Sequence, residues 1–204
     1  MTSEAGNSPN DPAGSVQIRP GTQVDSSAVH ALVQRAYAPY VDRIGRQPGP
    51  MTDDYPAKIE QGHLSVAIDG SGVVGLIVLV EEPDHLLVEN VAVDPGRQSA
   101  GIGRTLLAFA EETARAAGLR TLRLYTNAAM TENLAFYPRL GYEEVDRRTD
   151  NGFERVFFAK HLPQEVRGRT ASGKPITDDL IEGLAEAAEA GYSVNDAVRR
   201  RPGR

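Results

Sequence analysis

A glycine-bearing loop, residues 98–103, separates an apolar stretch from a long amphipathic one and could bind an anion. The first backbone N–H groups of a helix lack hydrogen-bond partners and carry the positive end of the helix dipole, so they attract phosphate. Glycines let a ligand approach these groups closely, and flanking arginines add positive charge. A pyrophosphate group could bind to these N–H donors and arginines. The residues expected to contact it are Arg97, Gln98, Ser99, Ala100, Gly101, Ile102, Gly103 and Arg104.

Two other phosphate-binding motifs do not fit this loop. The phosphate loop of nucleotide hydrolases ends in Gly-Lys-Ser/Thr, whereas Gly103 is followed by Arg104 and Thr105. A Rossmann fingerprint needs a third glycine, where this chain has Leu106. Glycine pairs at strand-to-helix junctions also occur in turns that bind nothing, so a purely structural turn is the alternative interpretation.

Two motifs in this order resemble the GNAT family of N-acetyltransferases. The first is Val-x-Val-Asp-Pro followed by Gln-x-x-Gly-x-Gly, and the second runs from Asn133 through Tyr137 to Gly141 and Tyr142. The resemblance covers about residues 16–162. It implies that the loop binds the pyrophosphate of acetyl-CoA, that Asn133 contacts the pantetheine arm, and that Tyr137 protonates the thiolate of coenzyme A.

Further features around the two motifs refine the expected binding of acetyl-CoA. Ser99, where the family often has glycine, and Ala100, where it often has a basic residue, predict a lower affinity. The resemblance also implies that backbone groups of Val91 and Val93 pair with the pantetheine like an added strand. The amide of Ala92 or Val93 is expected to stabilise the oxyanion of the reaction.

Acetyl transfer to an amine requires a base, because the pKa of an ammonium is about 10. Glu89 lies on the strand that leads to the loop, and in related enzymes a carboxylate at this place is the base, often through water. Asp53 and Asp54, in the region that covers the acceptor site in the family, could instead attract the amine or be the base, with Tyr55 beside them. The structural alternatives are a solvated strand residue for Glu89 and helix N-terminal charges for the aspartates.

Hydrophobic periodicity predicts the elements that position these residues. The expected order is strand, two helices, three strands, helix, strand, helix and two strands, with Pro39 ending the first helix. This is the order of the GNAT fold, an α+β (α/β) fold. Its central sheet is mixed and mostly antiparallel, with about seven strands and helices on both faces. Strands are expected over residues 16–19, 64–68, 73–80, 86–93, 121–125, 142–148 and 153–159.

Three segments are expected along the chain. Residues 1–15 are polar and predict a disordered leader, residues 16–162 form the acetyltransferase domain, and residues 163–204 form a helical C-terminal tail. Within the tail, a loop over residues 163–174 precedes a helix capped by Thr177. The tail loosely resembles the segment before the DNA-binding part of ribbon-helix-helix antitoxin-like proteins. The alternative is an amphipathic helix that packs on its own domain or on a second subunit.

The composition of the 204 residues excludes several classes of function. The chain has no cysteine, so disulfides and thiolate chemistry are absent, and its four histidines show no metal-binding spacing. No signal peptide or membrane-spanning run is evident, so a cytoplasmic protein without a membrane partner is expected. The net charge of −6 argues against non-specific nucleic-acid binding and favours cationic partners such as amines.

The sequence and the resemblance together predict a transferase of the acyltransferase class. It is an acetyl-CoA-dependent N-acetyltransferase that acts on a primary amine of a small molecule or protein, by direct attack in a ternary complex. One alternative is a toxin-like acetyltransferase acting on aminoacyl-tRNA, which the tail suggests and the acidic body opposes. The other is a non-catalytic acyl-CoA-binding module with a partner-binding tail. The acceptor stays open, and a homodimer formed through the tail helix is a further expectation.

Overall fold

The computed structural model of the protein describes residues 16–163, 168–177, 180, 181, 183 and 184. The predicted leader and most of the predicted tail therefore lie outside the described residues. The chain divides into two compact units, Met1–Leu162 and Pro163–Arg204, and each is described by itself.

The first unit is built around a seven-stranded sheet with the strand order β1-β2-β3-β4-β5-β7-β6. Neighbouring strands are antiparallel except β4 and β5, which are parallel, so the predicted mixed and mostly antiparallel sheet is confirmed. The strands are β1 (Gln17–Pro20), β2 (Leu64–Asp69), β3 (Gly72–Glu81), β4 (Leu86–Val93), β5 (Thr121–Asn127), β6 (Glu143–Asp150) and β7 (Phe153–His161).

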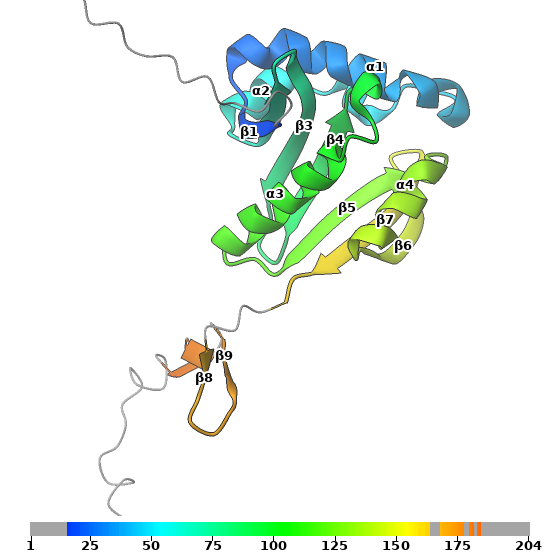
Figure 1. Ribbon diagram of the computed structural model, residues 1–204. Coiled ribbons are helices and arrows are strands. Elements are labelled where there is room, and N and C mark those ends of the chain that lie inside the picture. Colours follow the sequence, from blue (N-terminus) through cyan, green and yellow to red (C-terminus); the bar gives the residue numbers. More distant parts are fainter. Residues whose placement is uncertain (1–15, 164–167, 178–179, 182, 185–204) are drawn as a thin grey trace, which may run out of the picture. The chain divides into compact units, whose positions relative to one another are not determined.

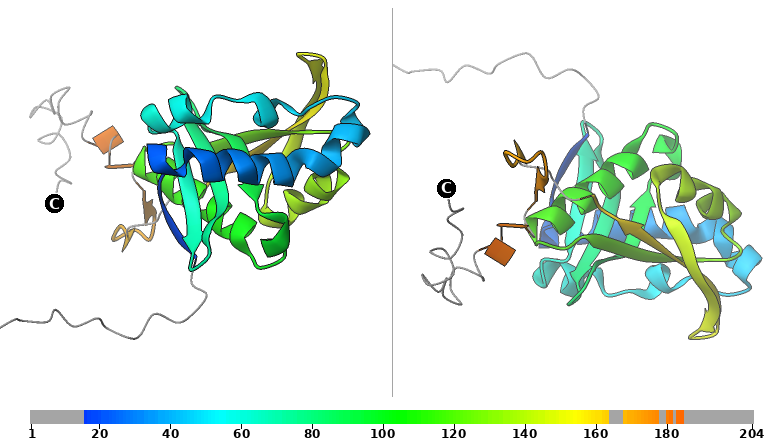
Figure 2. Two further views of the ribbon diagram at one scale, coloured as in Figure 1. Left: turned by 90° about the horizontal axis from the view of Figure 1, so that it is seen from above. Right: turned by 90° about the horizontal axis from the view of Figure 1, so that it is seen from below.

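Helices cover both faces of this sheet (Figure 1, Figure 2). Within residues 16–163 these are α1 (Ser26–Ile44), α2 (Tyr55–Glu60), α3 (Ile102–Ala116) and α4 (Thr131–Phe136). Helices α1 and α2 bury apolar side chains such as Val29 and Leu32 against one face. Helix α3 buries Leu106 and Leu107 against the other face, where α4 and Tyr137 also pack. The predicted order of elements is confirmed.

Helix α1 continues through Pro39, so the prediction that Pro39 ends it was wrong. The helix runs to Ile44, and Gly45, with φ 79°, ends it in the left-handed conformation. A proline inside a helix removes one N–H donor and crowds the preceding turn, and tertiary packing can outweigh that cost. The hydroxyl of Tyr37, two residues before Pro39 on α1, donates a 2.6 Å hydrogen bond to the β4 residue Asn90. The extra helical turns reach the opening between β4 and β5.

Strand β4 contains a β-bulge at Glu89, which the sequence did not reveal. Neighbouring residues of β3 pair with Val88 and with Asn90, so Glu89 has no partner on β3. This extra residue changes the alternation of the strand. Val88 faces the α3 layer, whereas Ala92, four residues later, faces the α1 layer.

Strands β4 and β5 pair only along the first part of β4. The parallel ladder joins Leu86–Val88 to Leu122–Leu124, and beyond it the two strands separate (Figure 1). The β5-facing edge of residues 89–93 therefore has no strand partner. Such an edge offers backbone hydrogen-bonding groups to a ligand in the middle of the sheet.

The second unit contains a short strand pair that was not predicted. Strand β8 (Gly168–Arg169) pairs with β9 (Pro175–Ile176) across residues that were expected to form a loop. The turn between them is held by a 2.8 Å backbone hydrogen bond from Thr170 N–H to Lys174 O. The hydroxyl of Thr177 accepts a 3.4 Å hydrogen bond from Leu180 N–H, as expected for a helix cap. Residues 180, 181, 183 and 184 are helical, and the rest of the predicted tail helices lies outside the described residues.

Candidate active site

Two cavities open between β4 and β5, and they share Tyr37, Val91, Asn133 and Tyr137. The first, which we call the loop cleft, is lined by the end of β4, the following loop, the start of α3, and residues of α1 and α4. The second, the carboxylate pocket, is lined by β4, β5, β7 and the end of α1 with its following loop, and encloses about 840 Å³ of empty space, open solvent included. The shared residues place the two cavities side by side.

The loop after β4 presents helix N–H groups to the loop cleft. Gly101, with φ 83°, is the N-cap of α3, and Thr105 is the first residue whose N–H bonds back, at 3.0 Å, to Gly101 O. The N–H groups of residues 102–104 therefore lack acceptors within the helix. A Cβ added at Gly103 would lie 3.6 Å from the nearest protein atom, in Phe136. Gly101 is needed for the backbone, because its positive φ is strained for other residues. Gly103 is not needed for the backbone, and the absence of a side chain there leaves space in the cleft for a ligand.

Two further residues shape the turn before α3. Ser99 has φ 69°, in the left-handed region that favours glycine, which explains physically why the family often has glycine there. The carboxylate of Asp94 accepts hydrogen bonds from Arg35 of α1, at 2.5 Å, and from Gly96 N–H, at 2.9 Å. Both hydrogen bonds lower the pKa of the Asp94 carboxyl, and the bond from Arg35 has the larger effect. The turn is therefore tied to α1.

The two arginines of the loop differ in their contacts. Arg97 lines the loop cleft, but its Nη2 lies 2.8 Å from the Asp69 carboxylate and 3.2 Å from the Ser71 hydroxyl, in the β2–β3 turn. Arg104 also lines the cleft and has no acidic partner within 4.0 Å in the part of the chain that the structure describes. Of the predicted pyrophosphate-binding residues, Ala100 does not line the cleft.

Backbone N–H groups along the end of β4 point in alternating directions. The N–H of Asp94 bonds to Val74 O on β3 at 2.9 Å. Because successive N–H groups of a strand point to opposite sides, the Ala92 N–H is directed toward β3 and those of Val91 and Val93 toward β5 and the cleft. The N–H groups of Ala92 and Val93 were the two predicted oxyanion donors, and of these the Val93 N–H points toward the cleft.

Tyr137 lies at the junction of the two cavities, directly after α4. Its side chain is buried, with its ring centroid 5.5 Å from that of Phe158 and 5.9 Å from that of Tyr142. Burial raises the pKa of the Tyr137 phenol, so the hydroxyl remains protonated at neutral pH. Asn133, one turn earlier, donates a 3.0 Å hydrogen bond to the Thr126 hydroxyl. The structure thus brings both residues of the second motif to the junction.

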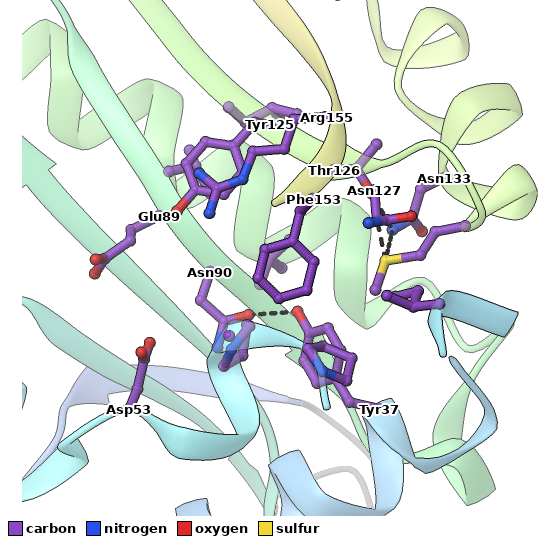
Figure 3. A pocket seen from close by; sticks show the side chains of 18 of the residues that line it. Tyr37, Asp53, Glu89, Asn90, Tyr125, Thr126, Asn127, Asn133, Phe153 and Arg155 are labelled. Atoms are coloured by element: carbon purple, nitrogen blue, oxygen red, sulfur yellow. Dashed lines mark hydrogen bonds between the residues drawn. The ribbon is translucent and has the colours of Figure 1, made fainter. Parts of the chain in front are cut away.

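Glu89 and Asp53 both line the carboxylate pocket (Figure 3), and both carboxylates contact one lysine. The Lys58 ammonium is 2.5 Å from the Glu89 carboxylate and 3.6 Å from that of Asp53. Burial opposes the charge of Lys58, but its bond to Glu89 and the charge of Asp53 outweigh burial and raise its pKa. Burial also raises the pKa of Asp53. The pocket therefore holds two carboxylates around one ammonium.

Asp54 and Tyr55, which were predicted to bind the acceptor, have structural roles. The Asp54 carboxylate caps α2 by accepting a 3.0 Å hydrogen bond from Ala57 N–H. Tyr55 is buried, and its hydroxyl donates to Pro50 O at 2.8 Å and accepts from the Asn90 amide at 3.0 Å. Of the three predicted acceptor-binding residues, Asp53 is the one that lines the carboxylate pocket.

The carboxylate pocket also contains residues that the sequence analysis missed. Tyr37, Asn90, Tyr125, Phe153 and Arg155 all line it and come from α1, β4, β5 and β7 (Figure 3). The alternation of the predicted fifth strand could have indicated which side of the sheet Tyr125 faces. No local signal marks the other four, because their meeting depends on how the strands and α1 pack.

Two general features of the described residues bear on this site. No group of three or more His, Asp or Glu residues among them could hold a metal ion. None of the described helices is long and apolar enough to cross a membrane.

Comparisons with known proteins agree with this geometry. Residues 60–144 match the family profile described as "Acetyltransferase (GNAT) domain". The uncharacterized protein YxbD of Bacillus subtilis is 32% identical over 113 residues, which cover 55% of this chain and 67% of that protein. The aminoalkylphosphonate N-acetyltransferase of Salmonella typhimurium is 29% identical over 135 residues, covering 63% of this chain and 85% of that protein.

The fold also resembles that of a solved structure. PaiA N-acetyltransferase from Thermoplasma acidophilum, in complex with coenzyme A, superposes with a TM-score of 0.62 at 18% sequence identity. The match covers 72% of this chain and 99% of that one. At this identity the likeness concerns the fold.

Proposed function

Because this chain belongs to the GNAT acetyltransferase family, we propose that it transfers the acetyl group of acetyl-CoA to a primary amine by direct attack in a ternary complex. One observation carries this proposal: the loop cleft and the carboxylate pocket are adjacent and share Tyr37, Val91, Asn133 and Tyr137. An acyl donor in the cleft and an amine in the pocket would meet beside Tyr137. The names of the Salmonella relative and of the coenzyme A complex support both halves of this assignment.

The loop cleft has the donors that the pyrophosphate of acetyl-CoA requires. Residues 102–104 contribute backbone N–H groups at the positive end of the α3 dipole, and Arg104 contributes a charge that no described carboxylate pairs. Gly103 leaves space above these donors. The outward N–H of Val91 and the outward carbonyl of Val93 are suited to pair with the amides of the pantetheine arm, which leaves the Val93 N–H for the thioester carbonyl. When bound, acetyl-CoA supplies the activated thioester.

The carboxylate pocket has the groups that an attacking amine requires. Glu89 accepts the proton of the substrate ammonium, directly or through water, and the freed amine nitrogen bonds to the carbonyl carbon of the thioester. The Val93 N–H stabilises the negative charge that develops on the carbonyl oxygen. As the carbon–sulfur bond breaks, Tyr137 donates its proton to the departing sulfur, and the nitrogen loses its second proton, through water, to the Tyr137 phenolate. The products are free coenzyme A and the acetylated amine, and Glu89 then releases the first proton to solvent. Asp53, on the same lysine as Glu89, is the alternative base.

The proposal is tested by calorimetric titration with acetyl-CoA, together with an assay of coenzyme A release on a panel of amines. We expect binding by the wild-type protein and about a tenfold or greater loss of affinity in Gly103→Ala. The added methyl group would make only ordinary contact with Phe136 but would occupy ligand space. Gly101 is unsuitable for this test because its φ of 83° strains any other residue. Thermal denaturation checks that Gly103→Ala remains folded.

The assay of coenzyme A release separates an enzyme from a binding module. Binding of acetyl-CoA without turnover of any amine would favour a non-catalytic acyl-CoA-binding protein. Unchanged affinity in a folded Gly103→Ala variant would contradict the assignment of the loop.

A further inference from the structure

The carboxylate pocket contains a cation that the acetyl transfer itself does not use. Arg155, on β7, lines this pocket, and 18% of its side chain is exposed. Its guanidinium lies over the ring of Tyr125, with 4.1 Å from Cζ to the ring centroid. Its Nη1 is 2.9 Å from the carboxylate of Asp150. Stacking and the ion pair together hold the plane of the guanidinium in place.

Arg155 retains hydrogen-bonding capacity for a ligand. A guanidinium carries five N–H donors, and the contact with Asp150 engages Nη1 alone. The remaining donors suit a carboxylate or a phosphonate, which guanidinium groups bind in a fork geometry. Asp150 is partly exposed, and ion pairs near the surface contribute little free energy. A ligand anion can therefore share the guanidinium with Asp150.

The opposite side of the pocket carries negative charge. Asp53 and Glu89 together hold one ammonium, that of Lys58, so this side has one carboxylate in excess. Figure 3 shows Asp53 on one side of the pocket, with Arg155 and Tyr125 on the other. Phe153 and Tyr37 add aromatic rings to the same lining. The pocket thus has an anionic side, a cationic side and an aromatic part of its surface.

We propose that the acceptor is a small primary amine that also carries an anionic group, a carboxylate or a phosphonate. Its ammonium lies at Glu89 and its anionic group at Arg155. This inference rests on the proposed acetyl transfer and narrows its substrate. A simple alkylamine or the side chain of a protein lysine offers no anion to Arg155, and such acceptors forgo a charge-assisted hydrogen bond.

The test compares acceptors that differ in the anionic group: propylamine, β-alanine and aminoethylphosphonate. We expect kcat/KM for at least one of the two anionic amines to exceed that for propylamine about tenfold to a hundredfold, the factor that one charge-assisted hydrogen bond supplies. Arg155→Met should remove this preference, because it raises KM for the anionic amine much more than KM for propylamine. Equal kcat/KM for all three amines in the wild type would overturn the inference.

Arg148→Met is the matched control on the same hairpin. Arg148 also stacks on a ring, with its Cζ 3.9 Å from the Phe157 centroid, and it pairs with Asp146. It does not line the carboxylate pocket. We expect this variant to keep the wild-type preference among the three amines. If both arginine variants lost the preference equally, the effect would belong to the hairpin, and the role of Arg155 would be refuted.

The experiments distinguish a wrong acceptor class from a wrong reaction. If propylamine is acetylated at least as well as the anionic amines, the proposed reaction holds and the acceptor class is wrong. If no amine is turned over, calorimetry on the protein loaded with acetyl-CoA still measures acceptor binding. In that case binding of β-alanine or aminoethylphosphonate that Arg155→Met abolishes supports the acceptor class, and no binding of either refutes it.

Discussion

The loop cleft and the carboxylate pocket are neighbours that different parts of the polypeptide build. The loop cleft relies on backbone: the N–H groups of residues 102–104 and the outward N–H groups at the end of β4. The carboxylate pocket relies on side chains that come from α1, β4, β5, β7 and the segment before α2. One continuous segment, residues 91–104, therefore supplies half of the residues that line the first cavity, whereas the lining of the second comes together only in the folded chain.

This difference predicts how each cavity responds to substitution. Every residue except proline supplies an N–H group, so a backbone site depends on the φ angles of its turn and on space for the ligand. A side-chain site depends on the identity of each group and on its charge partners. Substitutions in the pocket should therefore change the chemistry, and substitutions in the loop should change geometry or stability.

The largest expected effect is that of Glu89→Gln in the carboxylate pocket. An amide cannot accept the ammonium proton, so we expect kcat to fall about a thousandfold. Affinity for acetyl-CoA, measured by calorimetry, should stay unchanged because Glu89 does not line the loop cleft. Asp53→Asn is the matched control, with an expected loss of less than about tenfold, and a larger loss there than in Glu89→Gln would identify Asp53 as the base.

A smaller effect is expected for Tyr137→Phe, at the junction of the two cavities. Its proton assists the departure of a thiolate whose parent thiol has a pKa of about 8.5, and such a group also leaves unprotonated at some rate. We therefore expect kcat to fall about a hundredfold, with acetyl-CoA binding retained. Single-turnover release of coenzyme A measures this step. An unchanged kcat would show that Tyr137 is a packing residue within its aromatic cluster.

The smallest effect is expected for Ser99→Gly in the loop. Relief of the left-handed conformation at Ser99 is worth about 1–2 kcal/mol, and the greater freedom of glycine in the unfolded chain costs about 0.5–1 kcal/mol. We expect a net stabilisation of about 0.5 kcal/mol, measured by denaturant unfolding. Ala100→Gly, where φ is not positive, should destabilise the protein by a similar amount. Destabilisation by both variants would contradict strain at Ser99.

The loop was predictable because its signals are local. The pattern of residues 98–103 and the apolar strand before it predict a strand-to-helix turn without knowledge of any distant contact. The left-handed φ of Ser99 was not predictable from its side chain, and the helix end at Pro39 was predicted wrongly because packing of α1 outweighed a local preference.

The pocket was predictable only in part. Glu89 was identified by its place before the loop, but its bulge and its ion pair with Lys58 were not. Those depend on the register between β3 and β4 and on where α2 packs. Asp54 and Tyr55 were grouped with Asp53 because they are neighbours in the sequence. In the structure the carboxylate of Asp54 caps α2, and the side chain of Tyr55 is buried.

The sequence by itself determined the order of helices and strands, the hairpin turns and the loop that presents N–H groups, because each depends on residues close together in the chain. The turn at Asn151-Gly152, with φ 51° and 73°, is an example. The tertiary structure alone decided that Arg155 and Tyr37 share a pocket with Glu89. Burial, strand register and the separation of β4 from β5 bring these distant side chains together, and no local preference encodes them.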